Sequence, residues 1–235
     1  MNAQTVMTNS LELPKRGLYR AGGIAAFVLV VGYFLTFPVY GLVGFYPEGT
    51  AERLAYFAER TMGWWILTGL MVSTDLLYIP VWLALYRAMQ VTGKNVMLLA
   101  SAFIGCFVVL DLAVTWTAHA ALIAFGSEYA NATNEAQRAM LTAAAGYPSA
   151  ILDSPLLGIY AILLPSLGVL LTTYAMARAR FGKFTVLLGW VVALTGIIAG
   201  LFSGVLPMMP VVNALLAMVW FLFVGWNLFK LEPRG

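Results

Sequence analysis

The sequence predicts an all-α membrane protein: a polytopic bundle of six transmembrane helices with two short helices on its outer surface. First, 62% of its residues are hydrophobic and 10% are charged, against about 45–50% and about 25% in soluble domains. Second, the apolar residues form six runs, each long enough at ~1.5 Å per residue to cross a hydrocarbon core of roughly 30 Å. Third, the runs lack the period-two alternation of membrane strands, so helices must pair their backbone groups in lipid.

The six runs define the domain organisation. Residues 1–20 are predicted to be a cytoplasmic segment, 21–229 the transmembrane domain, and 230–235 a cytoplasmic tail. Because the first run is longer than the ~7–15 residues of a signal-peptide core, we interpret it as an uncleaved anchor. The predicted spans are Ala21–Phe45, Met62–Tyr86, Val96–Phe125, Pro155–Ala177, Phe184–Gly204 and Pro210–Phe229.

Basic residues predict the orientation, because Lys and Arg gather in the short cytoplasmic loops of membrane proteins. With the N-terminus inside, the outer loops hold only Arg53, Arg60 and Arg138, and the other ten of the 13 Lys and Arg lie inside. We therefore expect a cell-membrane protein with both termini in the cytoplasm. The net charge of +3 then reflects topology, and no nucleic-acid partner is expected.

The two longest loops lie on the predicted outer side, and each shows the start of a helix. Thr50 is a plausible N-cap for the first helix. In the second loop, "TNEAQRAMLTAAAG" predicts a helix that begins after Thr133 and ends at Gly146. Asp153 and Ser154 precede Pro155, a pattern typical of the start of a further helix, here the fourth span.

A stripe of small residues marks the fifth span, where Gly196, Gly200 and Gly204 recur every four residues. Glycines at this spacing let two membrane helices approach closely. The pattern favours a packing seam within the molecule, and a homodimer interface is the alternative.

Two acids lie within the predicted spans. Asp75 is near the middle of the second span and Asp111 near the middle of the third, so we expect their carboxyl groups to lie at similar depth, at the midplane. A charge at the bilayer centre costs ~2.5–3.5 kcal/mol on insertion scales, so such acids face the bundle interior and find partners. The sequence offers no base at that depth, so we expect the pair to hold a proton or to reach a hydrated cavity.

Further polar side chains extend this pair into a predicted track toward the outer surface. Thr115 and His119 follow Asp111 at intervals of four residues, and Tyr78 shares a helix face with Asp75. Asp153 is expected at the outer rim. The candidate ligand or proton site is therefore Asp75, Tyr78, Asp111, Thr115, His119 and Asp153. The alternative is that the two acids are protonated and act as hydrogen-bonding groups between helices.

Several chemistries are excluded or disfavoured by residue counts. The single histidine and single cysteine allow neither a bis-histidine haem, nor a three-histidine zinc site, nor an internal disulfide. We therefore expect no metal and no cofactor. The spans contain no G-x-S-x-G nucleophile motif, and the sequence makes an enzyme the less favoured interpretation.

Three stretches carry a resemblance to a known family: "TDLLYIPVWLALYRAM", "ATNEAQRAMLTAAAG" and "TTYAMARARFGKFTVLLGWVVALTGIIAG". Together they resemble a bacterial family of six-span integral membrane proteins that is known only as a domain of unknown function. The resemblance covers most of the chain. It implies the six-span fold and the membrane location, but no activity and no catalytic residues.

Two classes of function remain open at this stage. The favoured one is an accessory or scaffold subunit that contacts lipids and binds another membrane protein or complex. The alternative is a protein that binds or transports a proton, a cation or a small molecule through an outward-facing polar cavity between the second and third spans. Access of water to Asp111 distinguishes the two classes.

Overall fold

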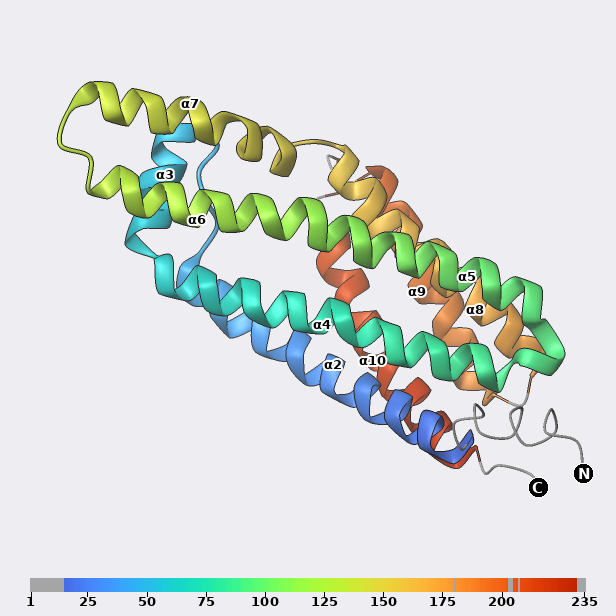
Figure 1. The fold of residues 1–235 in the computed structure, drawn as a ribbon. Helices are drawn as coiled ribbons and strands as arrows, with labels where there is room; N and C mark the ends of the chain where they lie inside the picture. The colour runs from blue at the N-terminus through green and yellow to red at the C-terminus, as the bar shows by residue number, and fades with distance from the viewer. Residues whose placement is uncertain (1–14, 180, 203–204, 207, 232–235) are drawn as a thin grey trace, which may run out of the picture.

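The computed structural model describes residues 15–179, 181–202, 205–206 and 208–231, and it is built from helices (Figure 1). Six helical segments in this part of the chain are long and apolar enough to cross a membrane. They correspond one to one with the six predicted runs, which confirms the predicted fold class. The segments are Gly17–Val43, Thr61–Ala88, Gln90–Ala130, Gly158–Arg178, Lys183–Phe202 and Met209–Lys230.

The six segments close a ring in chain order, because each one packs against the next and the last packs against the first. Their direction alternates, so α2 begins and α10 ends at the same end of the bundle (Figure 1). Aromatic side chains fill the interior, among them Tyr78, Trp82, Trp220 and Phe221. The helices of the ring are α2 (Lys15–Val43), α4 (Thr61–Ala88), α5 (Gln90–Leu110), α8 (Leu164–Arg178), α9 (Lys183–Phe202) and α10 (Met209–Lys230).

Two segments of the ring contain a π-helical turn. Helix α5 continues through η1 (Asp111–Trp116) into α6 (Thr117–Ala130), and η2 (Gly158–Leu163) leads into α8. A π-helix pairs residues five apart and widens the helix locally, and it is often found at functional sites. Both turns lie in the half of the ring that is further from the start of α2.

A second group of helices extends the bundle at the end opposite the start of α2, which is called the outer end after its predicted orientation. Helices α3 (Thr50–Glu59) and α7 (Glu135–Leu152) pack on α6, with α7 antiparallel to it (Figure 1). These helices and the outer ends of α2 and α4 enclose their own hydrophobic core, centred on Trp64 and including Phe57 and Leu122. The chain therefore has an inner core within the ring and an outer core beneath α3 and α7.

The two surface helices form where the sequence predicts them, but both of their predicted N-caps are wrong. Thr50 is the first helical residue of α3, and Gly49 before it makes no side-chain cap. Asn134, not Thr133, caps α7, since its Oδ1 accepts a 2.8 Å hydrogen bond from the amide of Gln137. Ser154, directly before Pro155, accepts a hydrogen bond at its Oγ from the amide of Leu156, in agreement with the helix start predicted there.

Helix α7 also runs past Gly146, where we expected it to end. It continues through Pro148 to Leu152. Ala145, Pro148, Ser149 and Leu152 are buried at helical spacing against the outer core. Burial of this face outweighs the low helix propensity of glycine and proline.

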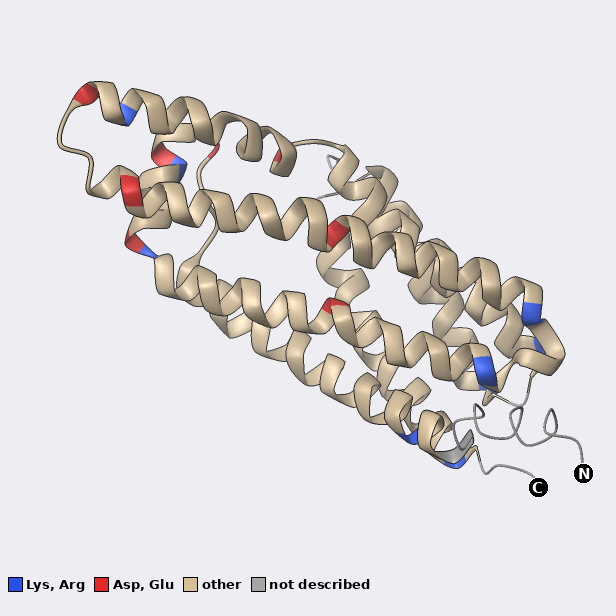
Figure 2. Ribbon diagram, viewed as in Figure 1, with Lys and Arg blue, Asp and Glu red and all other residues tan. Residues whose placement is uncertain are grey.

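Charges are distributed unevenly along the bundle (Figure 2). The end where α2 begins and α10 ends carries basic residues, including Arg87, Lys94 and Lys230, whereas acidic and basic residues mix at the opposite end. This is the asymmetry on which the predicted orientation depends.

Cysteine labelling tests that orientation in a Cys106→Ser background. Asn131→Cys and Glu48→Cys lie at exposed positions of the outer end, and Thr92→Cys lies at an exposed position of the inner end. We expect an impermeant maleimide added to intact cells to label the first two cysteines and to label the third only after permeabilisation. Labelling of Thr92→Cys in intact cells would reverse the orientation.

The glycine stripe of α9 lies inside the ring. A Cβ on Gly196 would collide with Ser166 of α8, and one on Gly200 would lie 3.0 Å from the carbonyl oxygen of Gly158 and 3.0 Å from the backbone nitrogen of Leu163. Gly204 lies outside the described residues. Two of the three glycines thus face the fourth spanning segment of the same chain.

Candidate functional site

The two acids within the spans meet at the contact between α4 and η1. Asp75 is 1% exposed and Asp111 is 6% exposed, and their carboxyl groups are close enough to interact with each other. The indole Nε1 of Trp116 donates a 2.8 Å hydrogen bond to Oδ2 of Asp75. The structure therefore brings together the two acids that the sequence singled out.

Trp116 is a site residue that sequence reasoning missed. In a regular α-helix, residues four apart share a face, which drew attention to Thr115 but not to Trp116, five residues after Asp111. The π-helical pairing of η1 brings residues five apart together, so Asp111, Thr115 and Trp116 are all buried. No sequence motif predicts this π-helical turn.

Thr115 links η1 to η2. Its hydroxyl lies 3.1 Å from the hydroxyl of Tyr160, and either group can donate. Tyr160 is half-buried and belongs to η2. The two π-helical turns therefore meet through a pair of hydroxyl groups beside Asp111.

Contacts with the fourth segment show how deep the acids lie. Thr115 is level with Tyr160, the third residue of Gly158–Arg178, and Asp111 is one turn further in. Trp82 donates to Thr172, and Asp75 lies two turns outward from Trp82, close to the middle of that segment. The two acids therefore lie at a similar level along the ring.

His119 lies one turn outward from Thr115 and is enclosed by aromatic rings. Its Nδ1 lies 2.9 Å from the carbonyl oxygen of Thr115, and because a carbonyl can only accept, Nδ1 carries the proton. Its ring centroid is 5.4 Å from that of Trp64 and 5.1 Å from that of Trp116. His119 therefore belongs to the packed outer core and is separated from the acids by Trp116.

Tyr78 lies one turn inward from Asp75, as the helical spacing predicts. Its hydroxyl is 3.1 Å from that of Tyr33 on α2, and its ring stacks on Trp82 with centroids 5.5 Å apart. Tyr78 therefore belongs to the aromatic core within the ring.

Asp153 lies apart from the other candidate residues. Its two carboxylate oxygens accept hydrogen bonds of 2.9 and 3.1 Å from Arg53, which is 1% exposed. Arg53 also donates to the carbonyl oxygens of Pro47, Glu48 and Ser149 and lies 4.7 Å from the ring centre of Tyr46. Burial raises the pKa of the Tyr46 hydroxyl, an effect that the charge of Arg53 partly opposes. Asp153 is thus the ion-pair partner of Arg53 and does not extend the polar track.

The acid pair has few partners for its charge. Among the residues that the structure describes, neither acid forms a salt bridge, and no group of three or more His, Cys, Asp or Glu side chains is placed to hold a metal ion. Oδ1 of Asp111 is buried without a hydrogen bond. Two carboxylates so placed repel each other unless a proton or another cation lies between them.

Comparison with known proteins gives no family assignment: no family model matches the chain, and neither a curated protein nor a solved structure shows significant similarity to it.

Proposed function

We propose that this multi-pass membrane protein binds a proton at Asp75 and Asp111 and exchanges it with the outer side of the membrane. The observation that carries the proposal is the buried acid pair, which no Lys or Arg neutralises within the described residues. Intramembrane acids of this kind mark proton or ion pathways in many membrane proteins.

The bonding of the pair favours exchange over a purely structural role. An acid that only holds helices together should have its polar atoms satisfied, because a buried unpaired acceptor costs ~1–3 kcal/mol. Oδ2 of Asp75 accepts a hydrogen bond from Trp116, but Oδ1 of Asp111 is buried and accepts none. A small metal cation is less suited to the site, since Ca²⁺ takes about 6–8 oxygen ligands and Mg²⁺ requires near-octahedral coordination.

Thr115 and Tyr160 supply a route for the proton. Both hydroxyls can donate and accept hydrogen bonds. Their 3.1 Å contact joins half-buried Tyr160 to Thr115, which lies beside Asp111. The route begins at the outer end of the fourth segment. It replaces the longer track through His119 and Asp153, since Trp116 separates His119 from the acids and Asp153 is bound by Arg53.

We further propose that the protein lies in the cell membrane with both termini in the cytoplasm. We also propose that it belongs to the six-span bacterial family that its sequence resembles. The basic residues of the inner end support the orientation. A role as a scaffold or partner-binding subunit, with lipids and a larger complex around it, is the competing proposal. It requires no proton exchange at the acid pair.

Infrared difference spectroscopy in lipid nanodiscs tests proton binding. We expect a carbonyl band of a protonated carboxyl group near neutral pH, which shifts in D₂O and is lost in Asp75→Asn or Asp111→Asn. The matched control is Asp153→Asn, which should keep the band because Asp153 lies outside the pair. Tyr160→Phe should slow the D₂O shift several-fold, since it removes one hydroxyl of the route.

The same variants distinguish a proton-exchanging site from a purely structural contact between helices. Asp75→Asn should melt close to the wild type, because an amide oxygen still accepts from Trp116, whereas Asp75→Leu should lose about 1–3 kcal/mol by leaving the indole unpaired. A missing carboxyl band, or a band that never exchanges with D₂O, would overturn proton exchange and leave the acids as a closed structural contact.

A further inference from the structure

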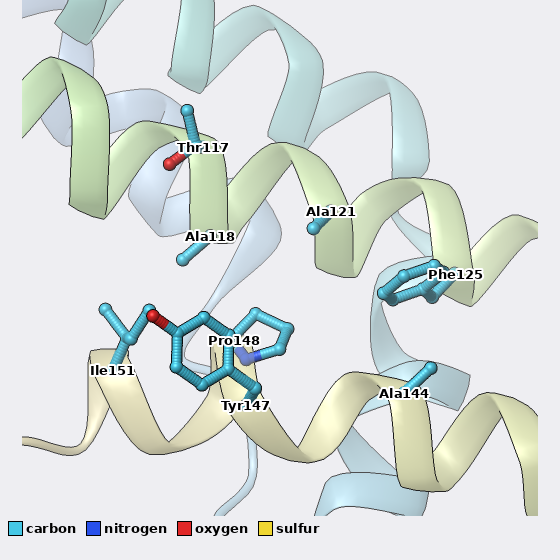
Figure 3. A pocket seen from close by; sticks show the side chains of 8 residues that line it. All are labelled: Thr117, Ala118, Ala121, Phe125, Ala144, Tyr147, Pro148 and Ile151. Atoms are coloured by element: carbon cyan, nitrogen blue, oxygen red, sulfur yellow. The ribbon is translucent and has the colours of Figure 1, made fainter.

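The groove between α6 and α7 lies on the outer part of the molecule, away from the acid pair. It has a volume of about 270 Å³. Small side chains, Ala118 and Ala121 of α6 and Ala144 of α7, leave the space between the helices, with Phe125 at one end and Tyr147 with Ile151 at the other (Figure 3). No charged residue lines it. An apolar groove of this kind is poorly suited to water.

The groove begins just beyond the outer end of the fourth segment. Thr115 is level with Tyr160, and the groove starts two residues further out at Thr117. His119, next to Ala118, stacks on Trp64, so the groove lies level with the start of α4.

Large apolar side chains are exposed at this same level on the neighbouring helices. On α4, Met62 is 74% exposed and Ile66 is 54% exposed, and beyond the end of α2, Phe45 is 93% exposed. Val43 of α2 packs beside Gly63, so these residues lie at one depth. Such a concentration of exposed apolar surface is stable only where lipid or a partner covers it.

The groove is also continuous with the membrane-facing surface of the third segment. Val109, Ala113 and Thr117 are all exposed, and Thr117 and Ala121, one turn apart on α6, both line the groove. A lipid chain lying against α5 therefore has an uninterrupted apolar path between α6 and α7.

The size and chemistry of the groove define the occupant. Its volume is slightly below the roughly 300–1,000 Å³ of typical small-molecule pockets, which suits one narrow chain better than a bulky ligand. The absence of charged lining residues favours the apolar tail of a lipid over its headgroup. We infer that the α6–α7 groove binds an acyl chain of an outer-leaflet lipid.

Photocrosslinking tests this inference in nanodiscs that contain a phosphatidylcholine with a photoreactive group in its acyl chain. We expect crosslinks to peptides from 117–125 and 144–151, together with crosslinks to the exposed face of α9 at Leu187 and Leu194. Ala144→Phe should fill the groove and lower the α6–α7 yield several-fold while leaving the α9 yield unchanged. The matched control is Ala150→Phe, at an exposed position of α7 that does not line the groove.

Accessibility of a single cysteine distinguishes the other occupants. In a Cys106→Ser background, we expect Ala121→Cys to react slowly with an impermeant maleimide. The lipid chain should protect this cysteine even without the Ala144→Phe substitution. Rapid labelling would show a water-filled groove. Slow labelling without lipid crosslinks would show a second protein copy in the groove. Equal crosslinking in Ala144→Phe and Ala150→Phe would show general contact with lipid. Each of these results would overturn the inference.

Discussion

Arg53→Met should detach the outer helices while leaving the six-helix ring in place. The expected loss of stability is about 3 kcal/mol or more, because several buried hydrogen bonds disappear together. The measurements are the apparent melting temperature in detergent and the rate of proteolysis within residues 131–134, the connection before α7. We expect a lower melting temperature and faster cleavage.

The geometry of Arg53 explains why the effect should be large. From α3, its guanidinium reaches two other segments: it donates to the carbonyl oxygens of Pro47 and Glu48 before α3, and to Ser149 and Asp153 at the end of α7. Asp153 is 53% exposed, so solvent screens its share of the ion pair. The buried carbonyl oxygens therefore supply most of the loss, and Asp153→Asn alone should cost no more than about 1 kcal/mol.

Two variants control for this prediction. Arg53→Lys keeps the charge but lacks the planar set of donors that reaches several acceptors at once. Its melting temperature should therefore be close to that of Arg53→Met. Arg138→Met removes an exposed arginine from the same outer group of helices and should melt within about 0.5 kcal/mol of the wild type. If Arg53→Met and Arg138→Met behave alike, Arg53 does not hold the outer helices.

Most of the fold was predictable because lipid imposes severe rules on the backbone. A run of apolar residues long enough to cross the bilayer must be helical, so the six segments follow from hydropathy alone. Their ends were less predictable. Gly146 and Pro148 would end a solvated helix, yet α7 continues because its far end packs on the outer core, a contact that involves residues distant in the chain.

The candidate site was predictable only as far as helical spacing is regular. Asp75, Tyr78, Asp111 and Thr115 are close together, as their positions on two neighbouring helices predict. Trp116 was missed because a π-helical turn changes which residues share a face. The partner of Asp153 was missed for a different reason. Arg53 lies 100 residues away in the chain, and no periodic pattern connects the two.

Gly200→Leu is expected to destabilise the contact between α9 and the fourth segment. A single Cβ at this position would already lie 3.0 Å from the carbonyl oxygen of Gly158 and 3.0 Å from the backbone nitrogen of Leu163. Backbone atoms cannot rotate away as a flexible side chain can, so α9 and the fourth segment would have to separate. Overpacking of this kind costs ~1–3 kcal/mol, and we expect a loss in the upper part of that range.

The matched control for Gly200→Leu is Gly105→Leu, because a Cβ at Gly105 of α5 meets nothing within 4 Å. Differential scanning fluorimetry and size-exclusion chromatography compare the two variants. We expect a clear fall in the melting temperature for Gly200→Leu alone, with the oligomeric state unchanged. A change in oligomeric state at constant melting temperature would instead assign the stripe to a homodimer interface. Equal melting temperatures of the two variants would mean that the ring can accommodate a leucine at position 200. The close approach of the helices at Gly200 would then contribute little to stability.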